Sequence, residues 1–277
     1  FFITEILSLK VQMIYITSDI HGKYSSLKII LEHVNFSEND QLIINGDLMD
    51  RGSELGLLID FVLNNSNVDV ILGNHEEMFL NACSSGFLTN KEIVEIETSS
   101  ILTGKKYRYL ESYDYNTNLW FSNGGDISYK TTSINDLRRL FEYLKDKKYY
   151  KIIDDNFIIH AGPYTLYSYD WTEKSFIDWI NNQMIKDLIW DREFFLKQFL
   201  SNEPIEYPYN IFIGHNSIYN QNIEPYKIMK NGNILVNTDQ SNNSDNYMNS
   251  LGLYCIETKT YYKLINDSLE ELKVLAL

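Results

Sequence analysis

Gly46-Asp47-Leu48-Met49-Asp50-Arg51-Gly52 is the stretch from which the fold can be predicted, because it joins an apolar run at 41–44 to a segment with helical spacing. The run is short and β-branched, which is typical of a buried parallel strand. After the stretch, Ser53 is placed to cap a helix whose apolar face is formed by Leu57, Leu58, Phe61 and Val62. We therefore predict a strand, a polar turn and a helix.

The same pattern occurs on both sides of this stretch. An apolar run at 13–17 precedes Ser18-Asp19-Ile20-His21-Gly22, and another at 68–72 precedes Gly73-Asn74-His75-Glu76. Together the three repeats predict a βαβαβ unit with parallel strands. Ligands of open α/β sheets bind beyond the carboxyl ends of the strands, so the three turns are expected to converge on one site.

The rest of the chain predicts an α/β protein with a second sheet. A helix is expected from about Ser133, capped together with Asp136, and a further helical stretch at 175–188. Strands are expected at 157–159, 211–213, 234–236 and 253–256, and these late strands are expected to form the second sheet. We treat 13–277 as a single domain, 84–130 as an inserted helical or loop region, and 1–12 as an N-terminal extension that need not be native.

Composition narrows the class of function. The net charge of -14 argues against nucleic-acid binding, because no basic stripe is present to contact phosphates. The two cysteines, Cys83 and Cys255, are far apart and form no C-x-x-C pair, which favours a reducing cytoplasm over a disulfide framework or a zinc ribbon. No signal peptide or membrane span is predicted.

Histidine is concentrated where the predicted strands end. Four of the five histidines, His21, His75, His160 and His215, lie at such ends. Each alone has an ordinary explanation as a turn, a cap or a structural residue, and Asp50-Arg51 alone would be read as a surface ion pair. Their conjunction at five strand ends favours a metal centre, whose N and O ligands suit Mn, Fe or Zn. His33, in the middle of a predicted helix, is assigned no function.

The chemistry that fits this set is phosphoester hydrolysis at two cations. A carboxylate that spans both ions is required, and Asp47 on the middle strand is the candidate. Arg51 is placed to bind phosphoryl oxygens, which accumulate charge in the transition state. His75, held by Asp50, can protonate the leaving group.

These motifs resemble a known family. Asp19-x-His21-Gly22, Gly46-Asp47-x-x-Asp50-Arg51-Gly52 and Gly73-Asn74-His75-Glu76 look like the three signature motifs of the phosphoprotein phosphatase family of metallophosphoesterases. Asn123-Gly124-Gly125, Trp190-Asp191-Arg192-Glu193 and Gly214-His215 are similar to segments of its small bacterial and phage, lambda-type branch. The resemblance implies a calcineurin-like fold in which two mixed β-sheets are sandwiched between helices (αββα).

The resemblance also implies roles for single residues. Asp19, His21 and Asp47 would hold one metal ion, and Asp47, Asn74, His160 and His215 the other, with Mn²⁺ favoured and Fe or Zn as alternatives. Arg51, Arg192 and Asn123 would bind substrate, although Arg192 could equally be a solvated charge at a helix end. A metal-bridging hydroxide would attack, with His75, oriented by Asp50, as the general acid.

The chain departs from the family at two places. Asn216 stands where the family usually has Thr, and Asn237-Thr238-Asp239 where the lambda-type branch often has Asp-Thr-Gly. No metal ligand is lost by these changes. They bear on loop geometry and therefore on substrate preference, and the segment 84–130 is expected to carry the substrate-selecting contacts.

Three functions follow as hypotheses. The leading one is a serine/threonine protein phosphatase, with phosphotyrosine as a further substrate class, acting on a phosphorylated protein or a small phosphoester. Glu76 and the Trp190-Asp191-Arg192-Glu193 segment favour it over the second, a symmetrical dinucleoside tetraphosphate hydrolase. The third is a non-catalytic metal-binding module, which is disfavoured because every expected ligand is present.

Overall fold

The computed structural model describes residues 12–89, 93–99, 106–112, 114–163, 171–200, 206–219, 223–241 and 249–274. Within these residues the first sheet has six strands in the order β13-β12-β11-β1-β2-β3. Its strands are β1 (Ile14–Thr17), β2 (Gln41–Asn45), β3 (Val68–Ile71), β11 (Ser250–Cys255), β12 (Thr260–Ile265) and β13 (Ser268–Lys273). The predicted βαβαβ unit is confirmed, because β1, β2 and β3 pair in parallel.

A second sheet has five strands in the order β6-β7-β8-β10-β9 within the same described residues. Its strands are β6 (Tyr150–Ile153), β7 (Asn156–Ile159), β8 (Asn210–Ile213), β9 (Tyr226–Ile228) and β10 (Ile234–Asn237). The three central strands run parallel and the two edge strands antiparallel to their neighbours. Both sheets are therefore mixed.

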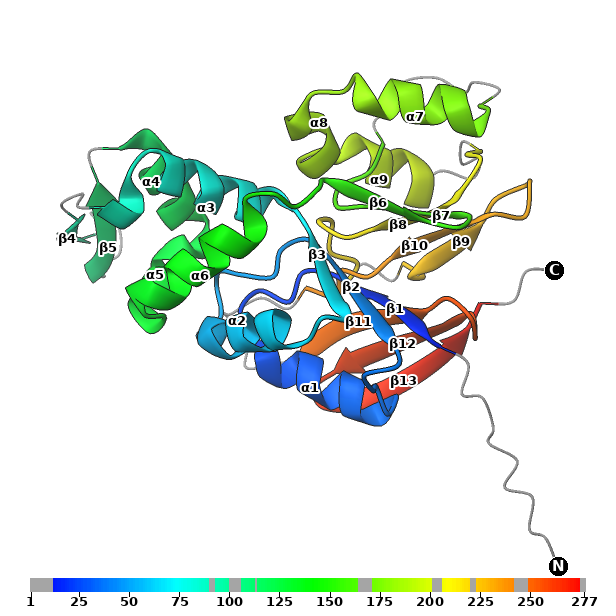
Figure 1. Cartoon of the computed structure of the whole chain (residues 1–277), viewed down its shortest axis with the longest axis horizontal. Helices are drawn as coiled ribbons and strands as arrows, with labels where there is room; N and C mark the ends of the chain where they lie inside the picture. Colours follow the sequence, from blue (N-terminus) through cyan, green and yellow to red (C-terminus); the bar gives the residue numbers. More distant parts are fainter. Residues whose placement is uncertain are drawn as a thin grey trace, which may run out of the picture.

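The two sheets pack face to face, and the alternation of side chains along each strand explains why. Ile16, Ile43, Ile158 and Phe212 are buried together between the sheets. Their neighbours in sequence point to the opposite faces, where helices cover them. As Figure 1 shows, α1 (Tyr24–His33) and α2 (Leu55–Asn64) lie on the outer side of the first sheet. The outer side of the second sheet is covered by α7 (Glu173–Asn181), α8 (Ile185–Ile189) and α9 (Glu193–Phe199). The predicted αββα arrangement is confirmed.

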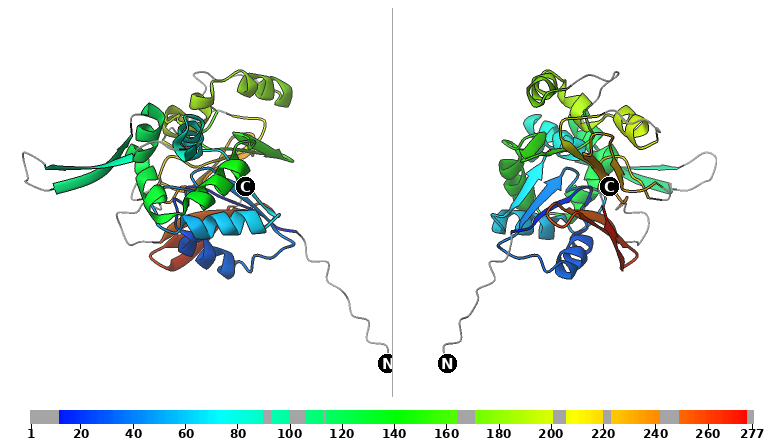
Figure 2. Two further views of the ribbon diagram at one scale, coloured as in Figure 1. Left: turned by 60° about the vertical axis from the view of Figure 1, so that its left-hand side comes forward. Right: turned by 90° about the vertical axis from the view of Figure 1, so that its right-hand side faces the viewer.

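The middle of the chain combines helices with a hairpin. Its elements are α3 (Asn74–Ser84), a 3-10 turn η1 (Phe87–Thr89), β4 (Ile93–Ser99), β5 (Lys106–Ser112), α4 (Tyr115–Trp120), a π-helical turn η2 (Phe121–Gly125), α5 (Asp126–Thr131) and α6 (Ile134–Leu144). Figure 2 shows the β4–β5 hairpin projecting from the body of the molecule. The sequence predicted helices or loops for 84–130 but not this hairpin.

Several sequence predictions are corrected by the structure. The strand expected at 253–256 belongs to the first sheet as β11, where it pairs antiparallel with β1. Ser53 does not cap α2, because Glu54 occupies the N-cap position and makes no side-chain bond there. The single helix expected at 175–188 is divided into α7 and α8. Ser133, in contrast, accepts a hydrogen bond from the Asp136 N–H at 3.1 Å, as the capping pattern predicted.

Two further sequence predictions concern the ends of the chain and membranes. Apart from residue 12, the extension predicted at 1–12 lies outside the described residues. No helix in the described part of the chain is long and apolar enough to cross a membrane.

Asp69 forms ion pairs that join the first sheet to the second. Its carboxylate, on β3, lies 2.6 Å from the Nζ atoms of Lys147, just before β6, and of Lys151, on β6 of the second sheet. Burial raises the pKa of Asp69, but the hydrogen bonds from the two lysines outweigh burial and leave the pKa below its ordinary value. The stabilisation is therefore present at neutral pH and is lost as the pH falls below about 4, where the carboxylate becomes protonated.

We expect Asp69→Asn to lower the free energy of unfolding by about 1 kcal/mol at pH 7, a value discounted for the partial exposure of the pair. Urea unfolding at pH 7 and pH 3.5 measures this, and the difference from the parent protein should shrink at the lower pH. Asp60→Asn, which breaks an exposed ion pair with Arg139, is the control. An equal deficit at both pH values would contradict the role of the charge.

Candidate metal centre

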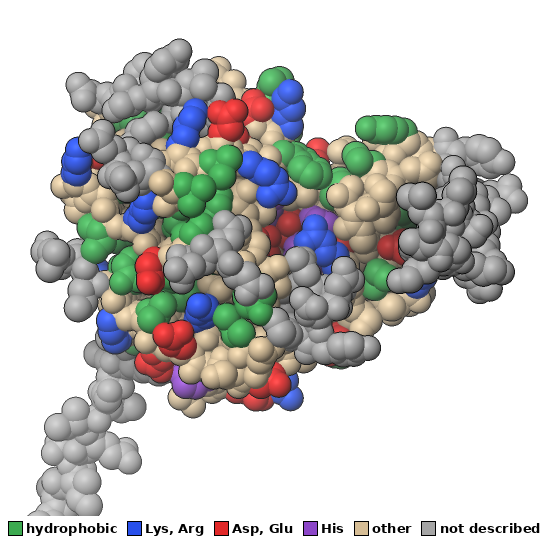
Figure 3. Space-filling view, turned by 180° about the vertical axis from the view of Figure 1, so that it is seen from behind, with side chains coloured by type: hydrophobic (Ala, Val, Ile, Leu, Met, Phe, Trp, Pro, Cys, Tyr) green, Lys and Arg blue, Asp and Glu red, His purple; other side chains and the backbone are tan. Residues whose placement is uncertain are grey.

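Five parallel strands end at one place, and each is followed by a polar turn. The turns after β1 and β2 are joined by hydrogen bonds from Asp19 N to Gly46 O (3.0 Å) and from His21 N to Asp47 O (2.9 Å). Those after β7 and β8 are joined by a bond from Gly214 N to His160 O (2.8 Å). The pocket between them has a volume of about 250 Å³. Figure 3 shows acidic, basic and histidine side chains gathered in a hollow of this face.

The pocket contains most of the predicted site residues. It is lined by Asp19, His21, Asp47, Arg51, Asn74, Asn123, Trp190, Arg192, His215, Ser217, Asp239 and Ser241. Of the remaining predicted residues, Asp50, His75 and His160 are buried and contact members of this set directly or through one intermediate. His33 lies on α1 and contacts Glu271 on the surface instead.

Many of these side chains are carried by backbone in the left-handed region. The φ angles are 53° for Asp19, 48° for His21, 56° for Asp47, 72° for Asp50, 67° for Arg51 and 62° for His215. Non-glycine residues rarely adopt this conformation, which costs on the order of 1 kcal/mol for each residue. Such outliers cluster at functional sites, where surrounding contacts hold them.

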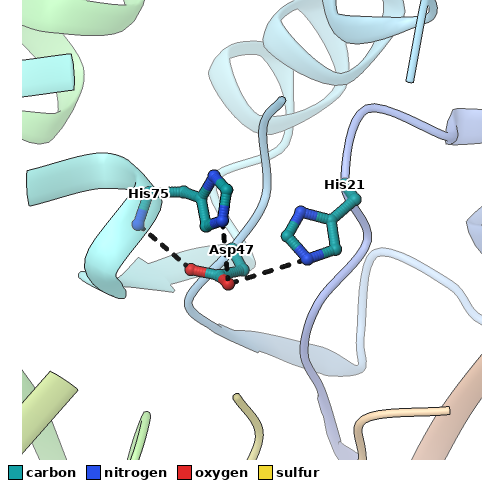
Figure 4. A group of neighbouring side chains, drawn as sticks. All are labelled: His21, Asp47 and His75. Atoms are coloured by element: carbon teal, nitrogen blue, oxygen red, sulfur yellow. Dashed lines mark hydrogen bonds and ion pairs between the residues drawn. The ribbon is translucent and has the colours of Figure 1, made fainter. Parts of the chain in front are cut away.

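Asp47 lies at the centre of the arrangement. Its Oδ1 is 3.2 Å from His160 Nε2, and its Oδ2 is 3.7 Å from His21 Nε2 and 3.8 Å from His75 Nε2. Figure 4 shows the His21 and His75 side of this group. Burial raises the pKa of Asp47, but the neighbouring imidazoles His160 and His75 outweigh burial and hold that pKa well below its ordinary value. The two carboxylate oxygens of Asp47 thus face different histidines: Oδ1 faces His160, and Oδ2 faces His21 and His75.

Two groups of possible metal ligands share Asp47. One contains His21, Asp47 and His75, and the other Asp47, His160 and His215, with the ligand atoms of each group within 4.8 Å of one another. Asn74 belongs with the second group, since its Oδ1 lies 3.1 Å from His160 Nε2 and 3.0 Å from His215 Nδ1.

The histidine rings are oriented as metal-binding imidazoles are. Nδ1 of His160 is 2.8 Å from the Asn45 carbonyl oxygen and Nδ1 of His21 is 3.1 Å from the Met49 carbonyl oxygen, so each ring can donate to the backbone through Nδ1 and present Nε2 to the site. Among the described residues, none forms a hydrogen bond with the buried Nε2 of His215. An orphaned buried nitrogen of this kind fits a site that binds a ligand.

The pKa values of the buried histidines around Asp47 show which of these rings carry a proton. Burial lowers the pKa of His160, but the Asp47 carboxylate more than offsets burial and raises that pKa to about 10. Burial, together with the charge of His160, lowers the pKa of His215 to about 3. Burial and the Arg51 guanidinium hold the pKa of His21 well below its ordinary value. His21 and His215 are therefore neutral and Asp47 is ionised, as metal binding requires, whereas the proton on His160 would be displaced by a bound cation. The N and O donors suit Mn, Fe or Zn.

Arg51 supplies positive charge from the pocket side. Its Nη1 lies 2.9 Å from His21 Nε2 and its Nη2 lies 3.0 Å from His75 Nε2. A guanidinium therefore spans the nitrogen atoms of two imidazoles that both face Asp47.

A buried chain of hydrogen bonds supports His75. Its Nδ1 lies 2.8 Å from Asp50 Oδ2. Asp50 in turn accepts hydrogen bonds from Trp120 Nε1 at 3.0 Å and from Ser128 Oγ at 2.8 Å. Burial lowers the pKa of His75, but Asp47 and Asp50 outweigh burial and the net pKa is raised. Sequence reasoning missed Trp120 and Ser128, and the available signal was a tryptophan three residues before Asn123-Gly124-Gly125.

The segment 84–130 therefore supports the site more than it lines it. Of its described residues only Asn123 lines the pocket, and the Asn123 amide donates to the Leu119 carbonyl oxygen at 2.8 Å. Gly124 has a φ of 101°, and a Cβ there would collide with the Arg51 side chain. The glycine thus allows this segment to approach Arg51.

Glu76 joins two of the turns. Its buried carboxylate accepts hydrogen bonds from the backbone N–H groups of Gly73 (2.9 Å), Asp47 (2.8 Å) and Leu48 (2.9 Å). The sequence pattern marked Glu76 only as a feature of the protein phosphatase branch. In the structure it fixes the turn after β2 relative to the start of α3.

Asp239 and Arg192 add charged groups to the lining of the pocket. Asp239, which the sequence did not single out as a site residue, lies in the pocket lining, and burial raises its pKa to about 6. Arg192 lines the same pocket, and its Nη1 donates to Asn216 Oδ1 at 3.0 Å. The pocket thus contains two arginines, Arg51 and Arg192.

Comparison with known sequences identifies the family. The family model for calcineurin-like phosphoesterases matches residues 13–239. A Shewanella-like protein phosphatase 1 of Plasmodium berghei is 30% identical over an alignment of length 149 that covers 43% of this chain and 41% of that protein. A symmetrical bis(5'-nucleosyl)-tetraphosphatase of Erwinia tasmaniensis is 40% identical over 79 residues, 28% of each chain. The matched stretches thus span less than half of these relatives.

Solved structures share the fold. A putative diadenosine tetraphosphatase superposes with a TM-score of 0.57 at 13% identity, covering 93% of this chain and 95% of that one. A protein serine/threonine phosphatase from Saccharomyces cerevisiae has a TM-score of 0.50 at 15% identity, covering 95% of this chain and 80% of that one. At these identities the likeness concerns the fold.

Glu76→Gln tests whether the carboxylate holds the turns. We expect the free energy of unfolding of the metal-stripped protein to fall by about 2 kcal/mol, because the amide replaces an acceptor by a donor and leaves a buried N–H unpaired. Urea unfolding measures this, with Glu32→Gln, at an exposed position on α1, as the control. Unchanged stability of Glu76→Gln would show that the turns are held by other contacts.

Proposed function

The chain belongs to the calcineurin-like phosphoesterase family, and we propose that it is a metal-dependent phosphomonoesterase that acts on phosphorylated protein, chiefly on phosphoserine and phosphothreonine. The observation that carries the proposal is the position of Asp47. Its two carboxylate oxygens face two groups of nitrogen and oxygen donors beside a pocket that contains two arginines.

Asp19, His21 and Asp47 would hold one metal ion, and Asp47, Asn74, His160 and His215 the other. Distance alone groups His75 with the first set, but the resemblance to phosphoprotein phosphatases implies that His75 is the general acid and Asp19 a ligand, and the buried Asp19 carboxylate lies 3.9 Å from His21 Nε2. We therefore assign Asp19 rather than His75 as the ligand. Two ions bound there, with Mn²⁺ favoured and Fe or Zn as alternatives, would polarise phosphoryl oxygens and make water nucleophilic at neutral pH.

The two arginines would bind the phosphate. The two Nη atoms of Arg51 contact the neighbouring imidazoles of His21 and His75. Both would donate instead to oxygens of a phosphoryl group placed beside His75. Arg192 faces the same pocket from the α8–α9 side. Rigid guanidinium forks suit the oxygens of a phosphoryl group and stabilise the charge that develops on them.

His75 would protonate the leaving group. Asp50 accepts from the ring at Nδ1, which fixes the ring and leaves Nε2 directed toward Asp47 and Arg51. A proton carried on Nε2 can pass to the oxygen of the departing side chain. Trp120 and Ser128 hold Asp50 and thereby help to orient this ring.

A symmetrical dinucleoside tetraphosphate hydrolase is the second candidate. The relatives include symmetrical tetraphosphatases, and a putative diadenosine tetraphosphatase has the same fold over most of the chain. The alignment with the protein phosphatase is longer, with a length of 149 against 79. This length favours the protein phosphatase assignment.

Metal removal and substrate choice test the proposal together. Metal-stripped protein is expected to release no phosphate from p-nitrophenyl phosphate and to become active on this ester and on a phosphoserine peptide when Mn²⁺ is added. Release of phosphate is measured for both and for a dinucleoside tetraphosphate. A preference for the tetraphosphate would select the second candidate. Silence on all three substrates with two metals bound would refute both candidates in favour of a narrower substrate or a binding module.

His75→Asn tests the general acid. We expect kcat to fall by about 10²–10⁴ for alkyl phosphates and by less for p-nitrophenyl phosphate, whose leaving group needs no proton. Metal content, measured by atomic absorption, should not change. His33→Asn, on the surface of α1, is the matched control and should retain full activity. An equal loss for good and poor leaving groups would rule out proton donation by His75.

A further inference from the structure

Asn216 connects the last candidate ligand to the second arginine. It follows His215 directly at the end of β8 and is 4% exposed. Its Oδ1 accepts a hydrogen bond from Arg192 Nη1 at 3.0 Å, and its Nδ2 points to the Asp191 carbonyl oxygen at 3.4 Å. One amide thus contacts both the guanidinium of Arg192 and the backbone just before it.

Asn216 is itself held by the sheet. Its backbone carbonyl accepts a hydrogen bond from Asn237 Nδ2 at 2.8 Å. Asn237 is fully buried at the end of β10, and its carbonyl oxygen accepts a hydrogen bond from Tyr261 OH on β12 at 3.1 Å. The Asn216 backbone is therefore linked through Asn237 to strands of both sheets.

A neutral acceptor suits this position. An arginine side chain has several rotatable bonds, and ordering it costs conformational entropy. A carboxylate in place of Asn216 would also order Arg192, but it would neutralise the charge that a phosphate needs. The amide oxygen orients the guanidinium and leaves its charge available.

We propose that Asn216 is a positioning residue that fixes Arg192 for phosphate binding, an inference that rests on the phosphate-binding role proposed above for Arg192. Asn216 acts only through Arg192 and touches no reacting atom. The hydrogen bonds of the Asn216 side chain fix the loop between α8 and α9, which carries Arg192, relative to the end of β8. Phosphate affinity then depends on Asn216 as long as Arg192 is present.

A double-mutant cycle tests this dependence. Asn216→Leu, which keeps the side-chain volume and removes both polar atoms, is combined with Arg192→Ala, and the Kd of inorganic phosphate for the Mn²⁺-loaded proteins is measured by calorimetry. We expect each single variant to weaken phosphate binding, Asn216→Leu by about tenfold. In the Arg192→Ala background, Asn216→Leu should have no further effect.

Controls separate positioning from general destabilisation. Asn210→Leu, at the opposite end of β8, removes side-chain bonds to Asn156 and Ile234 and should leave phosphate affinity unchanged. Asn216→Ser, which also breaks both contacts but keeps a small polar group, replaces Asn216→Leu in the cycle if that variant does not fold. With p-nitrophenyl phosphate, the effect should fall on KM more than on kcat.

The outcomes are decisive in either direction. An additive cycle, in which Asn216→Leu weakens phosphate binding equally with and without Arg192, would overturn the proposal, as would unchanged affinity in Asn216→Leu or in Arg192→Ala. Because phosphate binding is measured without turnover, a chain that binds phosphate but hydrolyses no ester would refute the proposed function and still decide the role of Asn216.

Discussion

A buried carboxylate that must be matched by positive charge is the constraint on which the rest of this site depends. Asp47 is 2% exposed, and an isolated ionised carboxylate at such a depth would be strongly unfavourable. The structure surrounds it with imidazoles from three other strand ends and places the Arg51 guanidinium against the Nε2 atoms of two of them. The parallel pairing of β1, β2 and β3, and the packing of the second sheet against the first, are what bring those groups within reach.

Two more buried carboxylates, Asp50 and Glu76, are also stabilised by surrounding groups, in their case mostly by hydrogen-bond donors. Asp50 is satisfied by the indole N–H, a hydroxyl and an imidazole, and Glu76 by three backbone N–H groups. Neither lines the pocket, yet Asp50 determines how His75 is held and Glu76 determines where the turn after β2 lies. The centre is therefore rigid because its supporting carboxylates are fully hydrogen-bonded, which is the condition under which buried polar networks favour a unique structure.

How far the sequence could predict this depends on how local each signal is. The strand, turn and helix of residues 41–64 follow from a few adjacent residues, and so the positions of Asp47, Asp50 and Arg51 at a strand end were predictable. The contact between Trp120 and Asp50 joins residues 70 positions apart, so helix and strand periodicity cannot show it, and the place of Trp120 before Asn123-Gly124-Gly125 was the available signal. The pairing of β11 with β1 likewise depends on which edge of the sheet is free, which local sequence does not show. In β12 and β13, lysine and glutamate stand among the apolar residues and hide the alternation of apolar and polar side chains that would indicate a strand.

The left-handed backbone of the strand-end turns has a consequence for how this protein evolves. Glycine adopts those angles without strain, so at Asp19, His21, Asp47, Asp50, Arg51 and His215 a neutral drift toward glycine would relieve the backbone. Natural selection on the side chains is the force that opposes this drift. A descendant that no longer needed the chemistry would accumulate glycine at these positions while its two sheets still packed together, and such substitutions would distinguish inactive lineages from active ones among proteins of the same fold.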